Sequence, residues 1–88
     1  MRAVHFYGES FDEYSDWAKG ASNTFERLRR LITEARRDPF TGIGKPEALK
    51  HGRFKGYWSR RITDEHRLVY KVTDEAIIIL SCYNHYGE

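Results

Sequence analysis

Four side chains in the second half of this sequence have the types that cleavage of RNA without a metal requires: Glu47, Arg61, Arg67 and His85. A carboxylate kept ionised by neighbouring cations can take the proton from a ribose 2′-OH, and arginines can hold the oxygens of the attacked phosphate. A histidine can then protonate the departing 5′-oxygen near neutral pH. Because the attacking group is the 2′-OH, this chemistry predicts cleavage of RNA but not of DNA.

Each of these residues also has a plain structural explanation. Glu47 lies among cations, including Lys50 and His51, and could form a surface salt bridge of little energetic consequence. The arginines could be ordinary surface residues, and His85 with Tyr86 could be an inert end of the chain. A tyrosine beside the histidine could instead stack on an unpaired base.

The two arginines belong to a predicted β-hairpin with strands over Tyr57–Ile62 and His66–Val72. If Thr63–Glu65 forms the connecting loop, Arg61 lies directly opposite Arg67, whereas a two-residue loop would offset the pair. Like charges opposite each other destabilise a sheet. An anion between them removes that penalty, and phosphate is the natural candidate.

Strand alternation separates two other residues of the hairpin from this pair. Arg60 points to the opposite strand face, which favours a structural role or an external contact. His66 shares a face with Leu68 and Tyr70 and is expected to be a packed structural histidine.

The elements that must position these side chains follow from hydrophobic spacing and from start and stop signals. The order is a strand, two helices and then a run of strands, which predicts an α+β domain with both helices on one face of a twisted antiparallel sheet. The other sheet face is expected to be free and basic. The predicted elements are a strand over Ala3–Tyr7, a helix capped by Ser10 and Glu13 and ending at Gly20, a helix starting with Asn23 and Glu26 and stopped by Pro39, an edge strand over Pro46–His51, the hairpin, and a buried strand over Ala76–Tyr83.

The length and the charge of the chain limit the kinds of protein that it can be. The 88 residues form one domain, 1–88, and the net charge of +2 hides a basic middle. Residues 36–71 hold ten basic and four acidic side chains, which favours a polyanionic partner such as nucleic acid. The single cysteine, Cys82, and the lack of a signal peptide or membrane span are consistent with a cytoplasmic protein. No metal-ligand spacing or phosphate-binding loop occurs, so no metal or cofactor is expected.

Several blocks of the sequence resemble one known family. They are residues 44–51 (GKPEALKH), 56–62 (GYWSRRI) and 65–70 (EHRLVY), with the terminal His85-Tyr86. In this order they resemble the YoeB (Txe) branch of the RelE toxin superfamily. The resemblance implies a RelE-like fold and a toxin of a type II toxin–antitoxin pair. It also implies a ribosome-dependent endoribonuclease, an mRNA interferase that cuts messenger RNA in the ribosomal A site and so inhibits translation.

The resemblance also implies roles for individual residues. Glu47 matches the family's general base, His85 its general acid, and Arg67 the arginine that stabilises the phosphate in the transition state. The substrate- or phosphate-contacting positions are Lys50, Arg61 and Tyr86, with His51 close by. The implied partners are a cognate YefM-type antitoxin, whose acidic segment would fold over the basic face, the ribosome with its mRNA, and a second copy of the chain in a homodimer.

The sequence departs from the family pattern close to the proposed acid. Tyr83 and Asn84 precede His85 where an arginine and an aromatic residue are expected, and Gly87 and Glu88 extend past the usual terminal tyrosine. Two other functions stay open at this point. One is a non-catalytic module that blocks translation by occupying the ribosome, and the other is a domain that binds only an acidic partner.

Overall fold

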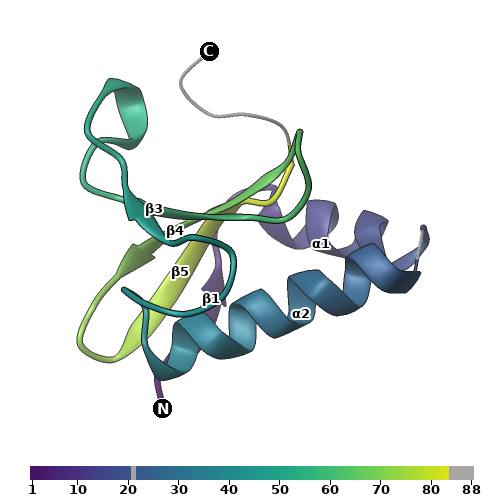
Figure 1. The fold of residues 1–88 in the computed structure, drawn as a ribbon, viewed down its shortest axis with the longest axis horizontal. Helices are drawn as coiled ribbons and strands as arrows, with labels where there is room; N and C mark the ends of the chain where they lie inside the picture. The colour runs from purple at the N-terminus through teal and green to yellow at the C-terminus, as the bar shows by residue number, and fades with distance from the viewer. Residues whose placement is uncertain (21, 84–88) are drawn as a thin grey trace.

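The structure, a computed structural model, describes residues 1–20 and 22–83. A five-stranded sheet in the order β1-β5-β4-β3-β2 carries both helices on one face, as Figure 1 shows. The α+β architecture expected from the sequence is therefore confirmed. The elements are β1 (Ala3–Phe6), α1 (Ser10–Ala18), α2 (Ser22–Arg37), β2 (Glu47–Ala48), the short 3-10 helix η1 (Gly52–Phe54), β3 (Trp58–Arg61), β4 (Arg67–Val72) and β5 (Ala76–Ser81).

The sheet is antiparallel except at one edge. β2 pairs with β3, β3 with β4 and β4 with β5 in antiparallel fashion, whereas β1 lies parallel to β5. The expected run of antiparallel strands is thus confirmed for β2 to β5, and β1 adds a parallel edge to it. The chain leaves β1 through both helices and enters β5 from a β4–β5 hairpin, so nothing local dictates the relative direction of the two strands.

Helix α2 covers the sheet because its apolar residues recur every three or four positions. Leu28 and Leu31 are fully buried, and they pack against Leu68 of β4 and Ile77 and Ile79 of β5 in the core. The helix ends at Arg37, two residues before Pro39, as the stop signal predicts.

The predicted capping box at the start of α1 does not form. The Ser10 hydroxyl donates instead to the carbonyl of Ile79 (2.9 Å), and the Glu13 carboxylate accepts from the amide of Cys82 (2.8 Å). Both side chains therefore tie the helix to β5 and to the chain that follows it. A buried serine and a buried strand end have greater need of these bonds than an exposed helix terminus, which water can satisfy.

The boundary between the two helices also differs from the expectation. α1 ends at Ala18 with Lys19 in right-handed geometry, and Gly20 does not adopt the left-handed conformation. α2 is already helical at Ser22, so Asn23 lies inside the helix rather than capping it. The cap signals located the break to within two residues but misassigned its geometry.

A fully buried arginine links the hairpin to the loop before β2. The Arg60 Nε donates to the hydroxyl of Tyr70 (2.9 Å), which in turn donates to the carbonyl of Pro39 (2.7 Å). The other guanidinium nitrogens donate to backbone carbonyls of Asp38, Thr41 and Ile43 at 2.7–3.0 Å. Arg60 thus has a structural role, which is one of the two roles expected from the sequence. It holds the loop that delivers β2 to the sheet edge.

Two groups near this loop have shifted acidities. Hydrogen bonds from the Thr41 hydroxyl and the Phe40 amide lower the pKa of the Asp38 carboxyl. Burial raises the pKa of the Tyr70 phenol, although the bond from Arg60 opposes that change. Tyr70 is therefore a neutral hydroxyl that both accepts from Arg60 and donates to Pro39.

Within residues 1–20 and 22–83, no helix is long and apolar enough to cross a membrane. The same residues contain no cluster of three or more histidine, cysteine, aspartate or glutamate side chains suited to hold a metal ion.

The thiol of Cys82 is expected to be unreactive. Burial and the nearby carboxylate of Glu13 raise its pKa to about 12, and its side chain is 1 % exposed. Because the thiolate is the nucleophile, reaction with Ellman's reagent at pH 8 should be at least about 100-fold slower in the folded protein than in denaturant. Stoichiometric labelling of the native protein at the denatured rate would contradict this environment.

Candidate active site

The predicted arginine pair is confirmed. Arg61, at the end of β3, lies directly opposite Arg67, at the start of β4. The connecting turn is closed by the His66 carbonyl, which accepts from the amides of Ile62 (2.9 Å) and Thr63 (3.2 Å). The two guanidinium groups therefore start from paired positions on the sheet face away from the helices.

Strand β2 brings the carboxylate to the same face. Glu47 pairs with Ser59 of β3, whose partner on β4 is Val69. Residues paired across antiparallel strands share a face, so Glu47 belongs to the face that carries the arginines. Its Oε1 lies 3.7 Å from Nη1 of Arg67. The structure thus joins two of the proposed catalytic residues, which are twenty positions apart in the sequence.

The partners of this ion pair differ in their access to solvent. The Glu47 side chain is 63 % exposed, whereas that of Arg67 is 15 % exposed. A partly buried guanidinium interacts more strongly with an incoming anion than an exposed one, because water screens it less. An exposed carboxylate can still reach a substrate hydroxyl. The expected free face is only partly open, since Ser59 and Val69 on it are buried.

The backbone of Arg61 is held from two sides. Its amide donates to the carbonyl of Gly44 (2.7 Å), and its carbonyl accepts from Arg27 of α2 (3.0 Å). Its side-chain Nε is buried and has no hydrogen-bond partner among the described residues. A buried donor of this kind is costly unless something accepts from it. An anion at the arginine pair would do so.

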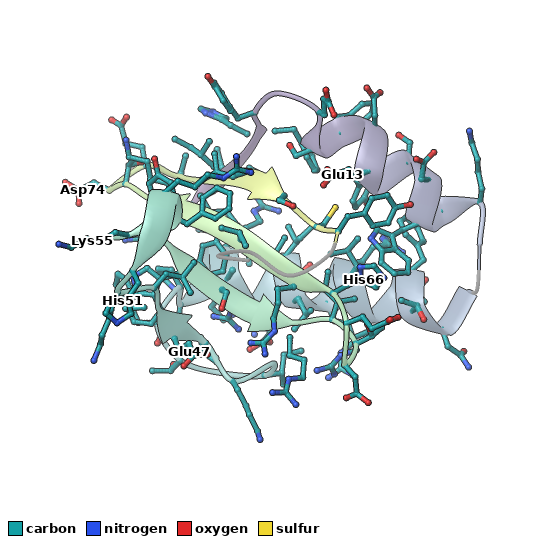
Figure 2. All side chains as sticks on the ribbon, turned by 90° about the horizontal axis from the view of Figure 1, so that it is seen from above. Glu13, Glu47, His51, Lys55, His66 and Asp74 are labelled. Carbon is teal, nitrogen blue, oxygen red and sulfur yellow. The ribbon has the colours of Figure 1, made fainter. Side chains whose placement is uncertain are left out.

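Lys50 and His51 lie on the exposed segment between β2 and η1. Figure 2 shows Glu47, His51 and Lys55 along one side of the sheet. The buried Leu49 anchors this segment, because its amide donates to the carbonyl of Tyr57 (2.8 Å). Lys50 and His51 thus follow Glu47 closely in the chain but are not part of its ion pair with Arg67.

The remaining proposed residues, His85 and Tyr86, lie outside the described residues, as do Asn84, Gly87 and Glu88. The last described part of the chain is attached to α1, where the Trp17 indole donates to the carbonyl of Cys82 (2.8 Å).

His66 packs as the sequence predicts. Its ring meets Trp17 edge-on at 5.0 Å between centroids and lies 5.6 Å from the ring of Tyr83. Figure 2 shows it on the side of α1, apart from Glu47. The expectation of a structural histidine is confirmed.

One site residue was overlooked in the sequence. Ser59 is two positions before Arg61 in the strand and so shares its face, and the structure sets it between Glu47 and the β4 strand of Arg67. The signal available was a small residue in a strand whose other members, Trp58, Arg60 and Arg61, are all large.

Two helices lie on one side of a twisted sheet, and a carboxylate and two arginines lie on the other. This combination places the protein in the class of small RelE-like toxins. Residues 6–86 match the family described as "YoeB-like toxin of bacterial type II toxin-antitoxin system", and the chain belongs to that family.

Individual toxins and solved structures are similar to this chain over nearly its whole length. "Toxin YoeB" of Mycobacterium bovis is 48 % identical over 86 residues, covering 98 % of this chain and all of the relative. The solved structure "YoeB/ParE toxin from Agrobacterium tumefaciens" is 40 % identical with a TM-score of 0.87 and covers 96 % of this chain and 99 % of that one. YoeB of Staphylococcus aureus has been solved as a YoeB–YefM complex, which is 37 % identical with a TM-score of 0.84 and covers 98 % of this chain and 99 % of that one. It has also been solved as a dimer, which is 38 % identical with a TM-score of 0.85 and covers 97 % of this chain and 98 % of that one.

Proposed function

We propose that this toxin is a ribosome-dependent endoribonuclease that cleaves mRNA in the ribosomal A site and thereby inhibits translation. The observation that carries the proposal is the contact of 3.7 Å between Glu47 and Arg67 beside the paired Arg61. Attack by a 2′-OH on a phosphate needs a base and cations that bind the phosphate. This sheet face carries one candidate base and two such cations.

In this mechanism Glu47 removes the proton from the ribose 2′-OH, and the oxygen attacks the adjacent phosphorus in line with the departing 5′-oxygen. Arg67 and Arg61 bind the equatorial oxygens, where negative charge increases in the transition state. His85 gives a proton to the 5′-oxygen as the bond to phosphorus breaks. The products are a 2′,3′-cyclic phosphate and a free 5′-hydroxyl.

Other residues would hold the substrate. Lys50 and His51 are exposed next to Glu47 and are suited to contact the RNA backbone, while Tyr86 would stack on a base. The carboxylate at the centre of the site is largely exposed, so mRNA held by the ribosome would supply the in-line geometry that the toxin alone does not impose.

The proposed partners follow from the same surface. A YefM-type antitoxin with an acidic segment would cover the basic face, as the YoeB–YefM complex from Staphylococcus aureus suggests by analogy. A homodimer is proposed on the analogy of the dimer from that organism. Activity on translating ribosomes implies a cytoplasmic location.

Primer extension on mRNA translated with and without the purified protein tests the proposal. Wild-type protein should produce cuts within A-site codons, and Glu47→Ala and His85→Ala should not. Glu26→Ala on the outer face of α2 serves as the control and should cut normally. Intact mRNA would refute nuclease activity. Inhibition that survives Glu47→Ala and His85→Ala would instead establish blocking of the ribosome by occupancy.

The segment around η1 is expected to contribute to ribosome binding by charge. Arg53 and Lys55 are exposed there, and Arg53 lies over the ring of Phe54 at 4.8 Å. In Figure 1, η1 stands clear of the sheet. If both cations contact phosphates, Arg53→Ala combined with Lys55→Ala should reduce the slope of log K against log salt by about 1.4–1.8.

The matched control removes two positive charges from the opposite side of the molecule. Arg29→Ala with Arg30→Ala, both exposed on α2, should leave the salt slope of ribosome binding nearly unchanged. Equal slopes for the two double variants would show that the effect depends on net charge and not on the η1 segment.

A further inference from the structure

The two members of the central ion pair are not neighbours in the sheet. Glu47 is on β2 and Arg67 is on β4, and β3 runs between them. Adjacent strands lie about 4.8 Å apart, so the β2 and β4 backbones are separated by roughly 10 Å. The carboxylate and the guanidinium nevertheless approach to 3.7 Å. Both side chains must therefore extend over β3.

The residues of β3 that share this face are Ser59, opposite Glu47, and Arg61, opposite Arg67, and the small one of the two is Ser59. It is paired with Glu47 on one side and with Val69, two residues from Arg67 on the same strand face, on the other. Its side chain is fully buried although it points away from the helices. Cβ atoms of paired residues are only about 5 Å apart, so the size of the side chain at position 59 decides how much room remains above it.

We propose that Ser59 is a positioning residue whose small side chain leaves the space in which Glu47 and Arg67 meet. A branched side chain at this position would occupy that space with methyl groups and would separate the pair. The consequence for cleavage rests on the proposed function. The consequence for the distance between the two side chains does not.

The test compares side chains of graded size at one position. Ser59→Ala keeps the space and removes only the hydroxyl, so its kcat should stay within about threefold of wild type. Ser59→Val adds bulk and should lower kcat by about 100-fold, because a misplacement of about 1 Å can cost that much. KM should change little, since Arg61 and Lys50 are untouched. A loss confined to kcat indicates an effect on the reacting groups rather than on binding.

A crystal structure of Ser59→Val provides a readout that needs no activity. It should show the Glu47–Arg67 contact opened beyond 4 Å with the sheet register retained, whereas Ser59→Ala should keep it. If Ser59→Val does not fold, Ser59→Thr, which adds one methyl group, replaces it in both measurements. If wild-type protein does not cut mRNA, the proposed function fails while the structural comparison still decides the role of Ser59.

Two results would overturn the inference. One is a folded Ser59→Val protein with the ion pair intact or with wild-type kcat. The other is a Ser59→Ala protein as inactive as Ser59→Val, which would assign the role to the hydroxyl and not to the size of the side chain.

Discussion

Replacing Arg67 with alanine is expected to lower the rate of mRNA cleavage by about 100- to 1,000-fold, the usual loss when one donor to a developing anion is removed. The guanidinium is 15 % exposed, so its interaction with a phosphate is weakly screened, and it is held within 3.7 Å of the proposed base. Single-turnover cleavage on programmed ribosomes measures the effect directly.

The fold should survive this substitution. Arg67 faces Arg61 across the hairpin, so its removal relieves a repulsion between like charges while leaving the strand backbone paired. Far-ultraviolet circular dichroism and thermal melting should match wild type. Arg67→Lys should recover only part of the rate, because a lysine cannot reproduce the planar two-donor geometry. Wild-type cleavage by folded Arg67→Ala protein would remove Arg67 from the mechanism.

The largest effect on stability is expected from Arg60→Met. This change keeps an apolar stem but leaves the Tyr70 hydroxyl and the carbonyls of the 38–43 loop without their buried donor. A buried acceptor left without its donor costs about 1–3 kcal/mol, so the loss of several such bonds together is expected to cost about 3–5 kcal/mol. For a domain of this size such a loss lowers the melting temperature by roughly 12–40 °C. Differential scanning calorimetry provides the measurement.

A neighbouring arginine supplies the matched control for that experiment. Arg61→Met removes the same group from the next position of the same strand, but on the opposite face, where the like charge of Arg67 opposes it. Its melting temperature should stay within about 4 °C of wild type, consistent with a change below about 1 kcal/mol. Equal losses in the two variants would show that burial of Arg60 contributes nothing specific.

The effect of Arg60 should extend to the active site through the loop that it holds. That loop leads to Gly44, whose carbonyl accepts from the amide of Arg61, and then to Glu47. Gly44 has a φ of 83°, and a Cβ there would approach Leu31 to 2.6 Å, so only glycine fits this close passage over α2. Arg60 and Gly44 together determine where β2 begins.

The arginine pair was predictable because the signals behind it are local. Alternation in a strand and a short loop over Thr63–Glu65 suffice to place Arg61 opposite Arg67 and to turn Arg60 to the other face. The apolar spacing of α2 likewise identified its buried side. Such features depend on residues within a few positions of each other, where backbone geometry leaves few alternatives.

Other expectations failed where a distant group competed for the same side chain. Ser10 and Glu13 match a capping box in sequence, but Ile79 and Cys82 offered buried partners that no local pattern reveals. The direction in which β1 pairs with β5, which the sequence did not specify, depends on the whole path of the chain between them. The family blocks identified residues for a site without showing their distances.

The sequence by itself determined the fold class, the basic face, the arginine pair and the family of this toxin, since each follows from residue type and short-range spacing. Only the tertiary structure decided that Glu47 on β2 reaches Arg67 on β4 across β3, and that Arg60 is buried on loop carbonyls. The physical reason is that each arrangement joins residues that are far apart in the sequence. The first requires the register of three neighbouring strands, and the second requires the 38–43 loop to pack onto the sheet.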